Sequence, residues 1–148
     1  MANSSNIRSG NMRVPHMVEE VNKRIAVLEL GYNPETMPKR VKIKLEQGRN
    51  FLEMISKPPY CTCKTVSSLT HMISDRRSDL QARSMALDYN MPGHQFSLFE
   101  QPQEVTPEQQ EEIAREQMWL NHEINWLHKC LGICKNRDYF EYARQSAD

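Results

Sequence analysis

Apolar residues recur along this chain mostly at the spacing of an α-helix, so a mainly α-helical protein is expected. The first helix is predicted over residues 16–30, between Pro15, which suits a first helical turn, and Gly31, which commonly ends a helix. Its apolar stripe consists of Val18, Val21, Ile25, Leu28 and Leu30. The polar residues 1–13 have little to bury and are expected to form a disordered tail.

A second helix is predicted between Pro38 and the proline pair Pro58-Pro59. The alternation of Val41, Ile43 and Leu45 is typical of a strand, but the length of the segment favours a helix. The helical pattern consists of Leu45, Phe51, Leu52 and Ile55. Gly48 is a weak point in this helix, because glycine lowers helix stability by about 1 kcal/mol relative to alanine.

Residues 65–87 are also predicted to be helical, with an apolar side formed by Val66, Leu69, Ile73 and Leu80. A polar run at residues 74–79 interrupts the pattern, and Ser78 and Gln81 have the spacing of a helix-capping box. Two helices joined by a short turn, a helix-turn-helix outline, are therefore expected. With the preceding helices they would make a basic helical module over residues 14–89.

Prolines and a glycine punctuate residues 90–106, which are predicted to be a linker. Thr106, Pro107 and Glu108 then offer a cap, a first-turn proline and a charge that complements the helix dipole. A long C-terminal amphipathic helix is predicted within residues 107–148, from an apolar stripe with alternating spacings of four and three residues. The positions of this stripe are Ile113, Gln117, Leu120, Ile124, Leu127, Leu131 and Cys134, and the polar Gln117 is the one break in it.

This stripe has two interpretations. It is either the face by which the helix packs on its own module or the seam of a coiled-coil homodimer. Trp119 and Trp126 widen the stripe, which favours burial against more than one neighbour. The aromatic residues that follow, Tyr139, Phe140 and Tyr142, either extend the helix or fold back as a short one.

The 19 basic and 19 acidic residues of the 148-residue chain are unevenly distributed. Residues 1–89 hold 14 basic and 9 acidic residues, a net charge of +5, whereas residues 90–148 hold 5 and 10, a net charge of −5. The basic N-terminal half could be a module that contacts nucleic acid. Alternatively, the opposite charges of the two halves could attract each other. Because the chain has no long apolar run and a polar N-terminus, a cytoplasmic protein without a membrane segment is expected.

The sequence lacks the familiar catalytic motifs, and its cysteines do not have the usual spacing of a metal site. It has no phosphate-binding glycine loop, nucleophile elbow or His-Glu-x-x-His motif, so a non-enzymatic protein is expected. Four cysteines could supply thiolates to zinc, but neither closely spaced pair has the usual Cys-x-x-Cys spacing, so buried thiols are favoured and no cofactor is expected. These cysteines are Cys61, Cys63, Cys130 and Cys134.

Four polar residues fall in the second half of the helix-turn-helix outline, where side chains could reach DNA phosphates and base edges. They are Arg76, Arg77, Gln81 and Arg83. Asp75 and Asp79 lie among them and lower the local charge. A solvated helix face is therefore the simpler interpretation, and DNA binding is the alternative.

The linker contains a cluster of apolar residues in the sequence Gln95-Phe96-Ser97-Leu98-Phe99. The linker itself has no helical or strand pattern with which these residues could form a core. Exposed aromatic residues of this kind usually bind a partner, although they could instead pack against the core of the same protein and hold the linker there. In an extended chain, Leu98 and Phe99 can reach two neighbouring subsites. The Gln95 amide can both donate and accept hydrogen bonds.

This pentapeptide resembles the Gln-Leu-Ser/Asp-Leu-Phe motif by which bacterial polymerases, mismatch-repair proteins and other replication factors dock on the DNA-polymerase sliding clamp. The resemblance implies that Gln95 engages the rim of a hydrophobic pocket and that Leu98 and Phe99 fill it, with Ser97 at the small or acidic position. Phe96 occupies the position at which leucine is commonest in this motif. The side chain at this position is expected to lie outside the deep pocket, so the substitution should be tolerated. The match covers five of 148 residues and identifies a partner rather than a whole-chain family.

The sequence thus predicts a non-enzymatic protein that docks on the bacterial sliding clamp and acts in DNA replication or interferes with it, as a phage or mobile-element protein would. The alternative is a helix-turn-helix DNA-binding regulator that dimerises through its C-terminal helix.

Overall fold

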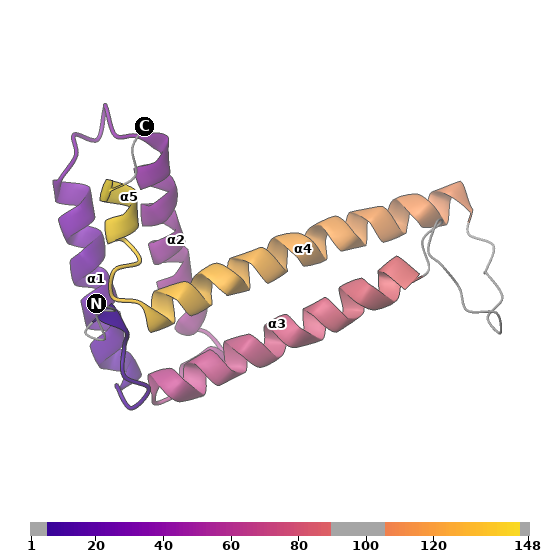
Figure 1. Ribbon diagram of the computed structural model, residues 1–148, viewed down its shortest axis with the longest axis horizontal. Helices are drawn as coiled ribbons and strands as arrows, with labels where there is room; N and C mark the ends of the chain where they lie inside the picture. The colour runs from indigo at the N-terminus through magenta and orange to yellow at the C-terminus, as the bar shows by residue number, and fades with distance from the viewer. Residues whose placement is uncertain (1–5, 90–105, 146–148) are drawn as a thin grey trace. The chain divides into compact units, whose positions relative to one another are not determined.

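The computed structural model describes residues 6–89 and 106–145, and these residues form a mainly helical protein (Figure 1). Its α-helices are α1 (Val14–Leu30), α2 (Lys39–Ile55), α3 (Val66–Tyr89), α4 (Pro107–Lys135) and α5 (Glu141–Gln145), with a short 3-10 helix, η2 (Tyr60–Thr62). In these two ranges, pairing of extended backbone is limited to isolated bridges. The predicted mainly α-helical class is confirmed.

The chain divides into two compact units. Unit 1 comprises Met1–Ile73 and Lys129–Asp148, and unit 2 comprises Ser74–His128. Because the boundaries fall within α3 and α4, each of these two helices contributes residues to both units. Unit 1 is therefore built from two stretches that are far apart in the sequence.

The core of unit 1 forms where α1 and α2 pack side by side, with α5 next to α2 (Figure 1). α1 buries Met17, Val21, Ile25 and Leu28, and α2 buries Val41, Leu45, Gly48, Phe51 and Ile55. Each set repeats every three or four residues, which places its members on one face of the helix. Both helices therefore present a continuous apolar face to unit 1.

The predicted first two helices are confirmed, with small shifts in their buried faces. α1 starts at Val14, with Pro15 in its first turn and Gly31 at its C-terminal end. Its stripe begins at Met17, and Leu30 is 85% exposed because it lies about 200° around the helix from Leu28. On α2, Ile43 is 43% exposed, which agrees with the helical rather than the strand interpretation.

The prediction of a disordered N-terminal tail is wrong for residues 6–13. The backbone N–H of Arg8 donates to the carbonyl of Lys135 (2.7 Å), and the N–H of Arg137 donates to the carbonyl of Asn6 (2.8 Å). The Arg8 side chain is only 1% exposed. A polar segment can thus be ordered without apolar residues, because carbonyl groups at the end of α4 accept its hydrogen bonds.

The predicted turn at residues 74–79, and with it the helix-turn-helix outline, is wrong, because α3 is one uninterrupted helix. Serine, aspartate and arginine are polar, but unlike proline and glycine they do not strongly disfavour a helix. Ile73 and Leu80 on either side of this run are both buried, two helical turns apart on one face. The predicted apolar side of the segment is therefore correct.

α4 begins at Pro107, as the sequence predicts, and its N-terminus carries a capping box. The N–H of Gln109 donates to Oγ1 of Thr106 (3.1 Å), and the N–H of Thr106 donates to Oε1 of Gln109 (3.0 Å). The helix ends at Lys135 rather than continuing towards residue 148. Tyr139 and Phe140 are buried and precede the short helix α5, so this segment folds back.

Gly48 occupies a crowded position on α2. A Cβ atom there would lie 2.7 Å from Cδ1 of Ile25 and 2.9 Å from Cε1 and Cζ of Phe140. Gly48→Ala is expected to lower the free energy of unfolding by up to about 2 kcal/mol, because overpacking costs about 1–3 kcal/mol and the gain in helix propensity offsets about 1 kcal/mol of it. Urea denaturation measures the change.

The matched control is Gly132→Ala in α4. A Cβ atom at Gly132 would lie 3.2 Å from Cε2 of Tyr139, so only a small adjustment is needed and a smaller loss is expected. If Gly48→Ala is as stable as Gly132→Ala or more stable, the packing argument is contradicted.

Candidate functional site

The predicted docking pentapeptide, residues 95–99, lies outside the described residues. The described part of unit 2 consists of residues 74–89 of α3 and residues 106–128, most of them in α4, and these segments flank the pentapeptide in the chain. They are the described residues nearest to the pentapeptide in the sequence.

α3 and α4 lie side by side in unit 2 as an antiparallel pair (Figure 1). Leu80 of α3 and Leu120 of α4 are buried at 4% and 0% exposure. Nε of Arg83 donates to Oε1 of Glu116 (2.7 Å), and Nη2 of Arg83 contacts the same oxygen. Because both side chains are partly exposed, this ion pair contributes at most about 1 kcal/mol, and apolar burial is the main stabilising term.

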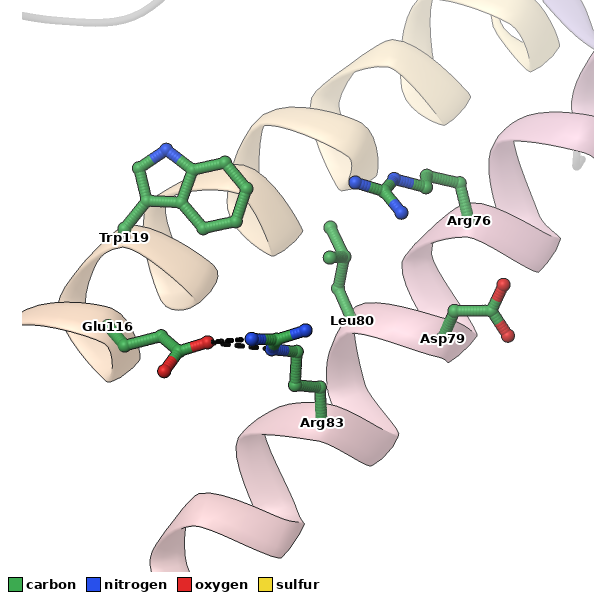
Figure 2. A pocket seen from close by; sticks show the side chains of 6 residues that line it. All are labelled: Arg76, Asp79, Leu80, Arg83, Glu116 and Trp119. Atoms are coloured by element: carbon green, nitrogen blue, oxygen red, sulfur yellow. Dashed lines mark hydrogen bonds and ion pairs between the residues drawn. The ribbon is translucent and has the colours of Figure 1, made fainter. Parts of the chain in front are cut away.

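A hollow of about 390 Å³ is lined by residues of both helices (Figure 2). The lining residues are Arg76, Asp79, Leu80, Arg83, Glu116 and Trp119. Leu80 and the indole of Trp119, which is 52% exposed, supply its apolar surface, and charged groups of both signs surround them. Tryptophan and arginine often dominate binding energy at interfaces, so this arrangement can hold an apolar side chain of a partner.

The predicted apolar stripe of α4 is buried unevenly. Leu120, Leu127, Leu131 and Cys134 are buried, whereas Ile113, Gln117, Ile124 and Trp126 are half-buried. The buried members include residues of both units, so the stripe contributes to packing within this chain. Dimerisation through the same stripe stays a prediction.

The four predicted DNA-contacting residues do not share one exposed face. Arg76 and Gln81 are exposed, Arg83 is paired with Glu116, and Arg77 is half-buried with its Nε atom shielded from solvent. All four belong to unit 2, which contains 4 basic and 10 acidic residues, a net charge of −6. DNA contact by these residues stays a prediction, and the charge of their unit opposes it.

The four cysteines are placed in different environments. Cys130 and Cys134 are buried, as favoured from the sequence, whereas Cys61 is exposed and Cys63 is half-buried, with its Sγ 3.8 Å from Sδ of Met72. Burial raises the pKa of the Cys134 thiol to about 12, so this thiol resists ionisation. Within residues 6–89 and 106–145, no three or more His, Cys, Asp or Glu side chains gather where they could hold a metal ion.

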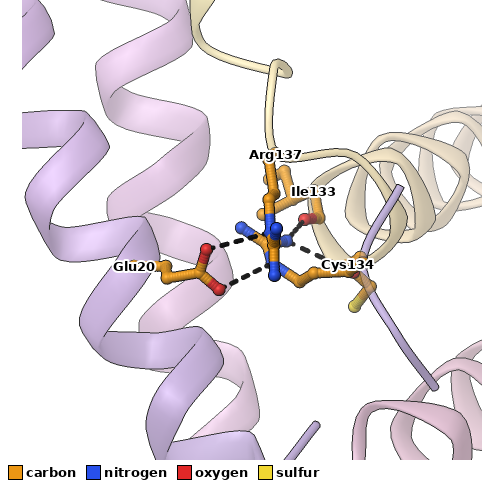
Figure 3. A network of polar contacts seen from close by, with 5 residues as sticks. Glu20, Ile133, Cys134 and Arg137 are labelled. Carbon is orange, nitrogen blue, oxygen red and sulfur yellow. Dashed lines mark hydrogen bonds and ion pairs between the residues drawn. The ribbon is translucent and has the colours of Figure 1, made fainter. Parts of the chain in front are cut away.

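A buried polar cluster in unit 1 connects the N-terminal segment, α1 and the end of α4 (Figure 3). Nη1 of Arg8 donates to the carbonyl oxygens of Ile133 and Cys134, the latter at 3.2 Å. Oε2 of Glu20 lies 3.7 Å from Nε of Arg8, and its Oε1 lies 3.1 Å from Nε of Arg137. Burial lowers the pKa of Arg8, against the attraction of Glu20. The charges of Arg8 and Arg137 are paired with the carboxylate of Glu20 within unit 1, so the cluster is structural.

None of the described helices combines the length and the apolar character needed to cross a membrane. Comparison of the chain with models of known protein families, with curated proteins and with solved structures gave no match. A functional assignment therefore depends on the residues of the chain itself.

Proposed function

We propose that this protein is a non-enzymatic binding protein that docks on the bacterial DNA-polymerase sliding clamp through residues 95–99. The observation that carries the proposal is the pentapeptide itself, Gln95-Phe96-Ser97-Leu98-Phe99, which resembles the clamp-binding motif. By this resemblance, Leu98 and Phe99 enter the hydrophobic pocket of the clamp and Gln95 hydrogen-bonds at its rim. Phe96 and Ser97 connect these contacts.

The position of the pentapeptide between two helices supports this proposal. Five residues separate Gln95 from Tyr89, the last residue of α3, and seven separate Phe99 from Pro107, the first residue of α4. An extended chain covers about 3.3–3.6 Å per residue, so each spacer can reach more than about 15 Å. The peptide can therefore enter a pocket on a partner while α3 and α4 stay folded.

The composition of the peptide also predicts its affinity. Burial of an apolar side chain contributes about 1.5–3 kcal/mol, and association costs part of this gain. A single peptide with two such side chains is expected to reach micromolar affinity, about −8 kcal/mol. Weak binding of this kind suits the sliding clamp, a ring to which many partners bind in turn. Docking would recruit this protein to replication sites, and at high concentration it would obstruct polymerases that use the same pocket.

Calorimetric titration of purified clamp with the full chain tests the proposal. The native chain is expected to bind with micromolar affinity, and Leu98→Ala/Phe99→Ala is expected to weaken binding by at least about 100-fold, because both side chains are interface hot spots. The matched control is Gln101→Ala/Gln103→Ala, which changes two residues of the same segment outside the pentapeptide and should bind like the native chain.

Two further readouts make the test specific. A synthetic peptide with the sequence Gln-Leu-Ser-Leu-Phe should displace the native chain from the clamp, because both would occupy one pocket. Circular dichroism should show unchanged helix content in Leu98→Ala/Phe99→Ala. Native-like clamp binding by this variant, or loss of its helical structure, would overturn the proposal, the latter because these residues would then belong to the protein's own core.

A further inference from the structure

The positive charge of the chain is concentrated in unit 1, which contains 15 basic and 9 acidic residues, a net charge of +6. The densest part is the beginning of α2, where four of the six residues 39–44 are Lys or Arg and none is acidic. The helix dipole places partial positive charge at this end, so cations here are unfavourable for helix stability. Stabilisation of α2 therefore does not explain these residues.

Two of these cations are held in defined positions. Nζ of Lys44 lies 3.6 Å from the centroid of the Tyr139 ring, and the Tyr139 hydroxyl donates to Oε1 of Gln47 at 2.7 Å. Nε of Arg40 donates to the carbonyl of Ala143 at 2.9 Å. Side chains that are already fixed lose less conformational entropy when they bind a ligand, so this flank of α2 is prepared for contact with an anion.

Lys129 of α4 adds a further cation to this region of unit 1. Burial, and then the charge of Lys129, lower the pKa of Lys44. Lys39 and Lys129 are exposed, whereas Lys44 and Arg40 are half-buried. The nearest acidic residue in the sequence of α2, Glu46, lies about 200° around the helix from Lys44, on a different side. An anion that approached this flank would therefore meet positive charge from both α2 and α4.

We propose that Lys39, Arg40, Lys44 and Lys129, here called the α2 basic surface, bind the phosphate backbone of duplex DNA. Duplex DNA presents a regular array of phosphates that several Lys and Arg side chains contact together. A lipid surface fits less well, because Ile43 is the one large apolar side chain that α2 exposes, and membrane-binding helices bury a broad apolar face. The inference is independent of clamp docking, and it concerns other residues than the arginines of α3.

Fluorescence anisotropy with a short labelled duplex and the full chain, without clamp, tests the inference. Binding should weaken with salt, and Lys39→Gln/Lys129→Gln should reduce the slope of log K against log salt concentration by about 2, roughly 1 for each lost phosphate contact. Both side chains are exposed, so this variant should keep the native fold. Lys44→Gln should lower the slope by about 1.

The matched control is Lys23→Gln/Lys57→Gln, which removes the same charge from two exposed lysines of unit 1 outside the α2 basic surface. It should keep the native slope, and Leu98→Ala/Phe99→Ala should bind duplex like the native chain. Equal slopes for Lys39→Gln/Lys129→Gln and the control would overturn the inference. Binding to anionic phospholipid vesicles without binding to duplex would also overturn it.

Discussion

Replacement of Glu20 by glutamine is expected to lower the free energy of unfolding by about 2–3 kcal/mol, less than for a fully buried ion pair because the Glu20 side chain is 29% exposed. The carboxylate of Glu20 forms ion pairs with both Arg8 and Arg137, and the Arg8 side chain is 1% exposed. Glutamine keeps the size of the side chain but removes its charge, so a buried guanidinium loses its carboxylate. Removal of one partner of a buried ion pair is costly for this reason. Urea denaturation followed by circular dichroism measures the loss.

The control for this prediction is Glu29→Gln in the same helix. Glu29 pairs with Arg49, but the two side chains are 47% and 55% exposed, so a loss of no more than about 1 kcal/mol is expected. The double variant Arg8→Met/Glu20→Gln should recover part of the loss, because the buried Arg8 cation is removed together with the carboxylate that pairs with it. If Glu20→Gln and Glu29→Gln are equally stable, the cluster does not stabilise the fold as argued.

Helix positions could be predicted from this sequence because local signals agree with the packing. Pro15 and Gly31 bracket α1, and Thr106 and Pro107 start α4 at the expected residues. The apolar side of α3 was also predictable, since Ile73 and Leu80 keep the helical period across the polar run. Local sequence signals are sufficient to predict a helix where helix propensity and apolar periodicity both agree with the pattern of burial.

Features that depend on distant residues could not be predicted in this way. Arg8 lies in a segment with no apolar pattern, and its carbonyl partners, at Ile133 and Cys134, are 125 and 126 residues away in sequence. Gly48 looked like a weak point of a helix, but its lack of a Cβ admits Ile25 and Phe140. In both cases the explanation is a tertiary contact, which a single sequence does not contain.

The candidate sites divide in the same way. The pentapeptide that we propose as a docking site could be identified from sequence alone, because a resemblance over five consecutive residues does not depend on tertiary contacts. The hollow at Leu80 and Trp119 depends on the pairing of two helices. In the α2 basic surface, Lys39, Arg40 and Lys44 are close in sequence, but the contribution of Lys129 could not be predicted because unit 1 is discontinuous in sequence. Division of the chain at residue 89 gives net charges of +5 and −5, whereas the two units carry +6 and −6.

A rise in pH above about 9 is expected to destabilise unit 1, because two of its buried groups keep their protons longer in the folded state. Burial raises the pKa of the Cys134 thiol from 9.0 to about 12, and it raises the pKa of the Tyr139 hydroxyl from 10.0 to about 12. Between these values the unfolded chain has lost a proton that the folded chain retains. By linkage, the free energy of unfolding is unaffected below the unfolded pKa and falls as the pH rises through the window.

A tenfold change in proton concentration shifts the free energy by roughly 1 kcal/mol for each group in its window, so at about pH 11 the loss from Cys134 and Tyr139 together is on the order of a few kcal/mol, with the larger share from Cys134. Lys44, whose pKa is lowered, acts in the opposite direction and offsets part of this loss. Urea denaturation from about pH 8 to about pH 11 measures the sum. Cys134→Ala creates a small cavity and so starts from lower stability, but its further loss above about pH 9 should be shallower because the buried thiol is absent. An unchanged pH dependence in Cys134→Ala would show that this thiol is not the group that titrates on unfolding.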